Sequence, residues 1–95
     1  MTTEELCVIA FDVASDKRRY RLTRVLEGYG HRVQESVFEA WLDEVQHQRL
    51  LVETSSVLDV NRDRLVCYRL SSDDLERVRS LGLATPPSNP EFHLL

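Results

Sequence analysis

The chain has few cysteines, no sequence motif with metal-ligand spacing and no long apolar run. It has two cysteines, Cys7 and Cys67, both inside apolar runs, and neither a Cys-x-x-Cys nor a His-Glu-x-x-His motif occurs. The three histidines lack the spacing of metal ligands, which argues against a zinc site. We interpret both cysteines as reduced core residues rather than as a disulfide. No apolar run approaches the roughly 20 residues of a membrane span.

Length and composition indicate one small globular domain. A chain of 95 residues buries a thin core, which makes a dimer a reasonable expectation. The apolar fraction of 42% and the charged fraction of 29% are those of an ordinary globular protein. The acidic start, MTTEEL, does not resemble a signal or transit peptide, so the cytoplasm is the expected location.

The chain as a whole has no excess of positive charge, but one segment is strongly basic. The net charge is −4, yet residues 17–32 hold six basic residues against one acidic residue. Such segregation attracts a polyanion locally, although a solvated helix face is the simpler explanation.

Two patterns near the start of the chain predict a strand followed by a helix. Residues 6–13, LCVIAFDV, are apolar on both alternating faces, which is typical of a central strand covered on both sides. Ser15 or Asp16 then caps a helix with one apolar stripe, and Lys17, Arg21 and Arg24 project away from that stripe. Gly30 is expected to end this helix as a left-handed cap.

The remaining elements are assigned by the same rules. In chain order they are a β-rich segment at 32–42 whose alternation breaks near 35–37, a helix at 43–58 that Asp43 starts, a strand at 64–70, a short helix or loop at 71–82, and a short strand, EFHLL, after the proline-rich ATPPSNP. The break near 35–37 indicates a bulge or a tight turn.

This order predicts an α+β, ferredoxin-like β-α-β-β-α-β sandwich, with two helices on one face of a four-stranded antiparallel sheet. We expect a domain at 1–85 and a tail at 86–95 that adds a strand to the partner subunit. The other sheet face needs cover, which a second copy would supply. Either Leu6, Val8 and Ala10 or Cys7, Ile9 and Phe11 lie on that face, and the pattern leaves both choices open.

Residues 8–39 carry a resemblance to a known family. A strand that ends in aromatic-Asp is followed by Asp-x-x-Arg opening a helix, by Tyr-Gly, and by Arg-Val-Gln-x-Ser-Val-Phe-Glu. In order and spacing these pieces resemble the small CRISPR-associated Cas2 endonuclease family, the companion of the CRISPR integrase in spacer acquisition. The resemblance implies a ferredoxin-like homodimer. Phe11 stands where many members have tyrosine, which weakens any role for a phenol there.

Asp12 is the predicted metal ligand and catalytic residue. A strand-end carboxylate can hold Mg²⁺ or Mn²⁺ together with water, and a second Asp12 across a dimer axis would improve the site. The resemblance adds Ser36 as catalytic and Phe11 and Phe38 as residues that shape the site. A simpler alternative is that Asp12 ends the strand and accepts hydrogen bonds from the turn.

The predicted phosphate-binding residues are Lys17, Arg18, Arg19 and Arg32. Each candidate other than Asp12 also has a structural explanation: Asp16 as a helix-start residue, Ser36 as a bulge residue, Phe38 as core, and the basic helix face as a solvated surface.

Two function classes remain open. The first is a metal-dependent endonuclease that hydrolyses RNA, double-stranded DNA or both during spacer acquisition. The second is a non-catalytic DNA-binding scaffold that bridges CRISPR integrase dimers. A toxin-like ribonuclease of similar fold is a remote third possibility.

Overall fold

The structure, a computed structural model, describes residues 3–82. The elements are β1 (Glu5–Asp12), α1 (Asp16–Glu27), β2 (His31–Gln34), β3 (Val37–Leu42), α2 (Glu44–Val57), β4 (Arg64–Leu70) and α3 (Ser72–Leu75). The ambiguous segment at 71–82 therefore contains a short helix. The predicted C-terminal strand, in residues 86–95, lies outside the described residues. Within residues 3–82, no helix has the length and apolar character to cross a membrane.

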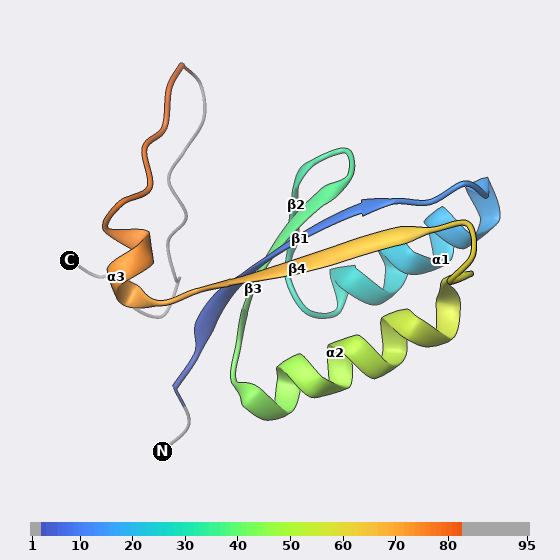
Figure 1. Cartoon of the computed structure of the whole chain (residues 1–95), viewed down its shortest axis with the longest axis horizontal. Helices are drawn as coiled ribbons and strands as arrows, with labels where there is room; N and C mark the ends of the chain where they lie inside the picture. Colours follow the sequence, from blue (N-terminus) through green and yellow to red (C-terminus); the bar gives the residue numbers. More distant parts are fainter. Residues whose placement is uncertain (1–2, 83–95) are drawn as a thin grey trace.

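The four strands form one antiparallel sheet in the order β2-β3-β1-β4. Helices α1 and α2 lie together on one face of this sheet, and α3 follows the far end of β4 (Figure 1). This is the ferredoxin-like arrangement that the order of the elements predicts.

The register decides which side chains of β1 face the helices. Cys7, Ile9 and Phe11 belong to the buried core beneath α1 and α2, so Leu6, Val8 and Ala10 point to the opposite face. The open face, as we call the side of the sheet away from α1 and α2, also carries Val66, Tyr68 and Trp41 from the neighbouring strands. Val66 and Tyr68 are 40% and 56% exposed, so apolar surface remains uncovered there.

Helix α1 begins and packs as predicted. Ser15 caps it by accepting a hydrogen bond from the Arg18 backbone N–H at 3.2 Å. Leu22 and Leu26 of the apolar stripe are fully buried, and each contributes about 1.5–3 kcal/mol of hydrophobic stabilisation.

The prediction that Gly30 is a left-handed cap is wrong. Gly82 is the one glycine in residues 3–82 with a positive φ angle. Gly30 is instead required by close packing, because a Cβ atom there would lie 2.0 Å from the Glu39 carbonyl oxygen and 2.7 Å from the Ala40 Cβ. The chain leaves α1 so close to β3 that no side chain fits between them.

The break in alternation near residues 35–37 is a hairpin. A two-residue turn at Glu35 and Ser36 joins β2 to β3, and the register shifts between Arg32 and Gln34. The predicted start of α2 is also confirmed: Asp43 forms a capping box with Gln46.

The apolar stripe of α2 is irregular because two of its buried positions are polar. His47 and Thr54 lie on the sheet-facing side together with Leu50. The Thr54 hydroxyl donates to the Leu50 carbonyl at 2.9 Å, so its burial leaves no unsatisfied group.

Candidate functional site

Asp12 is the last residue of β1, and its side chain is exposed. In the described part of the chain, its carboxylate accepts no hydrogen bond and forms no ion pair. The alternative role, accepting N–H bonds from the following turn, is filled by another residue, because the Ala14 N–H donates to Asp63 Oδ1 at 3.0 Å. Within residues 3–82, no hydrogen bond or ion pair of the Asp12 carboxylate therefore competes with binding a ligand.

The Asp12 hollow, as we call the concave region at this end of β1, has a volume of about 400 Å³. Its lining residues are Phe11, Asp12, Val13, Arg19, Glu35 and Ser36. The Phe11 N–H donates to the Ser36 carbonyl at 3.1 Å, which holds the hairpin turn against the end of β1. The structure thus brings together four predicted site residues: Phe11 and Asp12 from β1, Arg19 from α1 and Ser36 from the hairpin turn.

Arg19 is held at the rim of this hollow by two hydrogen bonds. Its Nη2 donates to the Val13 carbonyl at 2.8 Å, and its Nη1 donates to Asp16 Oδ1 at 2.6 Å. The side chain is still 44% exposed, so its positive charge remains accessible. Asp16, with a side chain that is 97% exposed in the first turn of α1, is a helix-start residue that positions Arg19.

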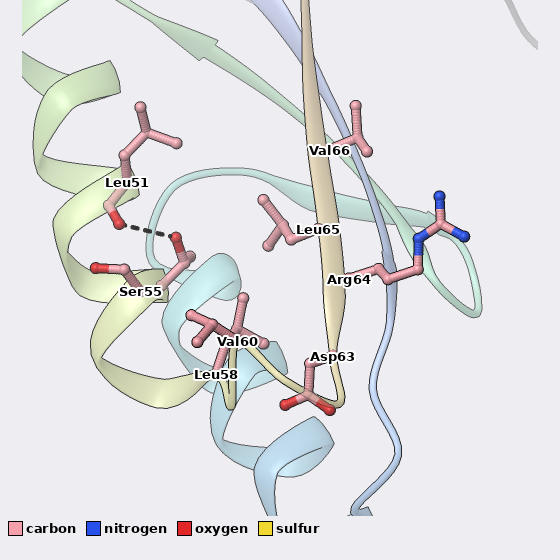
Figure 2. Close-up of a pocket in the computed structure, with 9 residues that line it drawn as sticks. Leu51, Ser55, Leu58, Val60, Asp63, Arg64, Leu65 and Val66 are labelled. Atoms are coloured by element: carbon pink, nitrogen blue, oxygen red, sulfur yellow. Dashed lines mark hydrogen bonds between the residues drawn. The ribbon is translucent and has the colours of Figure 1, made fainter.

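Arg18 is engaged inside the protein. Its Nε donates to Asp63 Oδ2 at 2.7 Å and its Nη2 to Asp63 Oδ1 at 3.1 Å, in a bidentate pair. The Asp63 side chain is completely buried, and the Arg18 hydrogen bonds hold the pKa of its carboxyl well below the usual range. Figure 2 shows Asp63 directly before the first residue of β4. This pairing argues against the predicted phosphate-binding role of Arg18.

Phe38 contacts both Arg32 and Phe11, and Phe11 lines the Asp12 hollow. Phe38 is fully buried, and its ring centroid lies 6.2 Å from that of Phe11. Phe38 is therefore a core residue, which was the structural alternative considered for it. The Arg32 guanidinium lies 5.6 Å from the centroid of the Phe38 ring, and its Nη2 donates to Thr23 Oγ1 at 3.3 Å. Arg32 is exposed, and its contact with phosphate stays a prediction.

The exposed basic face of α1 carries Lys17, Arg21 and Arg24. Lys17 and Arg21 form no ion pair with any residue in the range 3–82, whereas Arg24 lies 3.7 Å from Glu27. These side chains are available to a polyanion.

Sequence reasoning missed Arg64, Glu35 and Asp63. Arg64 lies directly opposite Asp12 in the β1–β4 register, and Figure 2 shows its side chain on the opposite side of β4 from Leu65. A basic residue that opens a strand was the signal available for Arg64. Nothing local marked Asp63, which looked like an ordinary turn residue.

The potential ligand atoms at the Asp12 hollow are of the kind that a hard divalent cation prefers. Asp12 and Glu35 supply carboxylate oxygens, and Mg²⁺ is commonly bound by one or two carboxylates together with several waters. No group of three close carboxylate, thiol or imidazole ligands occurs there among the residues that the structure describes. Asp12 and Glu35 are therefore the residues of this hollow whose carboxylates suit a divalent cation.

Fold and site together define a small ferredoxin-like protein whose strand-end carboxylate, near arginine side chains, is unpaired within residues 3–82. A family profile described as CRISPR associated protein Cas2 matches residues 5–78. The chain belongs to this Cas2 family, as the motifs in residues 8–39 indicated.

Curated relatives match over nearly their whole length. A protein named CRISPR-associated endoribonuclease Cas2 3, from Chloroflexus aurantiacus, is 35% identical over 93% of this chain and 95% of its own. One named CRISPR-associated endonuclease Cas2 2, from Thermus thermophilus, is 35% identical over 97% of this chain and 98% of its own.

Solved structures agree with this assignment. Streptococcus pyogenes Cas2 at pH 6.5 matches with a TM-score of 0.70 and 26% identity, over 81% of this chain and 99% of its own. A chain of a partial Cas6-RT-Cas1–Cas2 complex matches with a TM-score of 0.66 and 31% identity, over 90% of this chain and 96% of its own.

Proposed function

We propose that this chain is a metal-dependent endonuclease that hydrolyses phosphodiester bonds of RNA or double-stranded DNA during CRISPR spacer acquisition. The observation that carries the proposal is the Asp12 carboxylate, unpaired within residues 3–82 and adjacent to Arg19 and Ser36 in one hollow. The names of its relatives, endoribonuclease and endonuclease, support the same reaction class.

The residues of the hollow have complementary roles in this reaction. A bound Mg²⁺ or Mn²⁺ would supply an activated water and polarise the scissile phosphate. Asp12 would hold the ion, the Arg19 guanidinium would balance negative charge on the phosphate, and the Ser36 hydroxyl would donate to a phosphate oxygen. Arg19 is well suited to this role because Val13 and Asp16 already fix its guanidinium.

A homodimer completes the site in this proposal. Asp12 has the same parity in β1 as Leu6, Val8 and Ala10, so it borders the open face of the sheet. A second copy that covers this face would bring its own Asp12 to the same region. The CRISPR integrase is the other proposed partner, supported by the Cas1–Cas2 complex among the structural neighbours.

The test is cleavage by Asp12→Asn, which keeps the size of the side chain and removes the charge that a hard cation requires. We expect cleavage with Mg²⁺ to fall by about 100-fold or more, with an unchanged melting temperature. Asp73→Asn is the matched control, because it makes the same change at an exposed position in α3. Wild-type cleavage by Asp12→Asn, after contaminating nuclease is excluded, would overturn the catalytic role.

A non-catalytic DNA scaffold is the second candidate, favoured by the exposed Lys17 and Arg21 on α1. Both functions predict duplex binding, but only catalysis requires Asp12. Integration assays with the CRISPR integrase separate them: if Asp12→Asn lacks cleavage yet supports integration at the wild-type level, the scaffold role is the one used in spacer acquisition.

A further inference from the structure

Three potential metal ligands from separate elements converge in the core under α2. The Cys7 sulfur of β1 lies 3.7 Å from His47 Nδ1 of α2, and the Cys67 sulfur of β4 lies 4.0 Å from the same nitrogen. All three ligand atoms lie within 4.8 Å of one another. The absence of motif spacing in the sequence therefore does not exclude a metal site here, because its ligands lie 20 and 40 residues apart.

The sheet register places the two sulfurs on one face. Cys67 pairs with Ile9 across β1 and β4, and Cys7 pairs with Arg69 two residues further along β4. Residues two apart in a strand share a face, so both cysteines point toward α2. The capping box of Asp43 and Gln46 starts α2 directly before His47 and so fixes the backbone from which its ring reaches the two sulfurs. These backbone elements hold the cluster before any ligand binds.

The distances between the atoms suit a tetrahedral zinc ion. Zinc binds thiolate sulfur at about 2.3 Å and imidazole nitrogen at about 2.0 Å, which at tetrahedral angles separates sulfur from nitrogen by about 3.6 Å. The observed separations of 3.7 and 4.0 Å need to close by only a few tenths of an ångström.

Charge also favours a divalent ion at this position. Two thiolates and a neutral imidazole balance Zn²⁺, so the buried complex is neutral and avoids the cost of an uncompensated charge. The nearby cation, Arg69, is itself paired with Glu5 and Glu44 at 2.8 Å each. Thiolate and imidazole prefer zinc to Mg²⁺, so this cluster does not compete with Asp12 for the same metal.

We propose that Cys7, His47 and Cys67 bind one Zn²⁺ per chain, with water in the fourth position, and that the ion connects α2 to the central strand β1 and to the edge strand β4. This site lies on the helix-covered face of the sheet, whereas Asp12 borders the open face, so the proposal does not depend on the proposed nuclease function. Zinc in such a site contributes directly to folding stability.

Cobalt spectroscopy of the full chain tests the proposal without any substitution. Protein prepared with EDTA, freed of chelator and kept reduced, is titrated with Co²⁺. We expect saturation at one equivalent, with visible ligand-field bands of a tetrahedral site and near-ultraviolet sulfur-to-cobalt charge-transfer bands that Zn²⁺ then bleaches. Weak octahedral bands alone, or the absence of charge transfer, would overturn the proposal.

Substitutions then assign the ligands. Cys67→Ala, at the partly exposed position, should abolish the stoichiometric charge-transfer signal, and His47→Gln should do the same. His31→Gln and Asp12→Asn are the controls and should leave it unchanged. Zinc at about 100 times its Kd should raise the melting temperature of the wild type by about 10 °C and not that of Cys67→Ala. Equal shifts in both proteins, or an unchanged signal in Cys67→Ala, would rule out this ligand set.

Discussion

The buried carboxylate of Asp63 connects three separate segments of the chain through hydrogen bonds. Its carboxylate accepts from the Arg18 guanidinium, from the Ala14 N–H and from the Asp59 N–H at 2.8 Å. These donors come from α1, from the turn after β1 and from the turn before β4. Because the carboxylate is fully buried, removal of its charge leaves Arg18 without its partner and two backbone donors poorly satisfied.

We therefore expect Asp63→Asn to lower the melting temperature at pH 7 by an amount on the order of 10 °C. Folding lowers the pKa of Asp63 well below its ordinary value of 3.8, chiefly through the Arg18 hydrogen bond. Its stabilising contribution is therefore fully present above the unfolded-state pKa and is lost progressively as the pH falls from there toward the lower folded-state pKa. The difference in melting temperature between the wild type and Asp63→Asn should accordingly be smaller at pH 3 than at pH 7.

Asp16→Asn is the control for that experiment, because Asp16 also pairs with an arginine but its side chain is 97% exposed. Its melting temperature should stay close to that of the wild type. An Asp63→Asn variant as stable as Asp16→Asn would show that the Asp63 network does not stabilise the fold.

At the scale of an element, the exit from α1 depends on close packing against β3. Gly30→Ala is expected to cost about 1–3 kcal/mol in the free energy of unfolding, because the added Cβ overlaps the backbone of Glu39 and Ala40. Gly28→Ala is the matched control, since its Cβ meets only the Val25 carbonyl at 3.3 Å and its φ of −75° suits alanine. Urea denaturation measures the free energy of unfolding of both variants. Equal values for Gly30→Ala and Gly28→Ala would contradict the packing argument.

The basic residues of α1 divide into a structural group and an exposed group. Arg18 binds Asp63, whereas Lys17 and Arg21 are exposed. Lys17→Ala with Arg21→Ala should weaken duplex binding regardless of sequence and make the slope of log affinity against log salt shallower by about two units. Fluorescence anisotropy across a salt series gives this slope.

Arg18→Ala is the contrasting variant. It should lower the melting temperature because it leaves Asp63 buried without its partner, and it should leave the salt slope of binding unchanged. If the slope changes for Arg18→Ala and not for the double variant, the division of α1 into these two groups is wrong.

At the scale of the whole molecule, we expect a second copy of the chain to cover the open face. Val66 on this face is 40% exposed and lies beside Val8 and Ala10 of β1. Val66→Glu should produce a folded monomer in light scattering and, if the two copies of Asp12 act together, should also reduce cleavage. Val52→Glu on α2 is the control, because Val52 is 68% exposed and lies on another element. A Val66→Glu protein that remains dimeric would exclude this face as the interface.

The sequence by itself determined the features that depend on short spacings. Alternation along residues 6–13, the caps at Ser15 and Asp43, and the broken alternation near Ser36 each arise from neighbours a few residues apart. Their order was enough to predict the ferredoxin-like sandwich, and the motifs around Asp12 were enough to indicate the family. The nucleic-acid contacts and the tail at 86–95 stay predictions.

Only the tertiary structure decided which residues meet across long separations. Periodicity assigns the residues of β1 to two faces, but the side on which α1 and α2 pack is set by the connections between elements, so the open face could not be predicted. The packing of α1 against the end of the sheet pairs Arg18 with Asp63, 45 residues away. The register of β1 and β4 together with the position of α2 brings Cys7 and Cys67 to His47. Such contacts depend on how whole elements are positioned, and no local spacing encodes them.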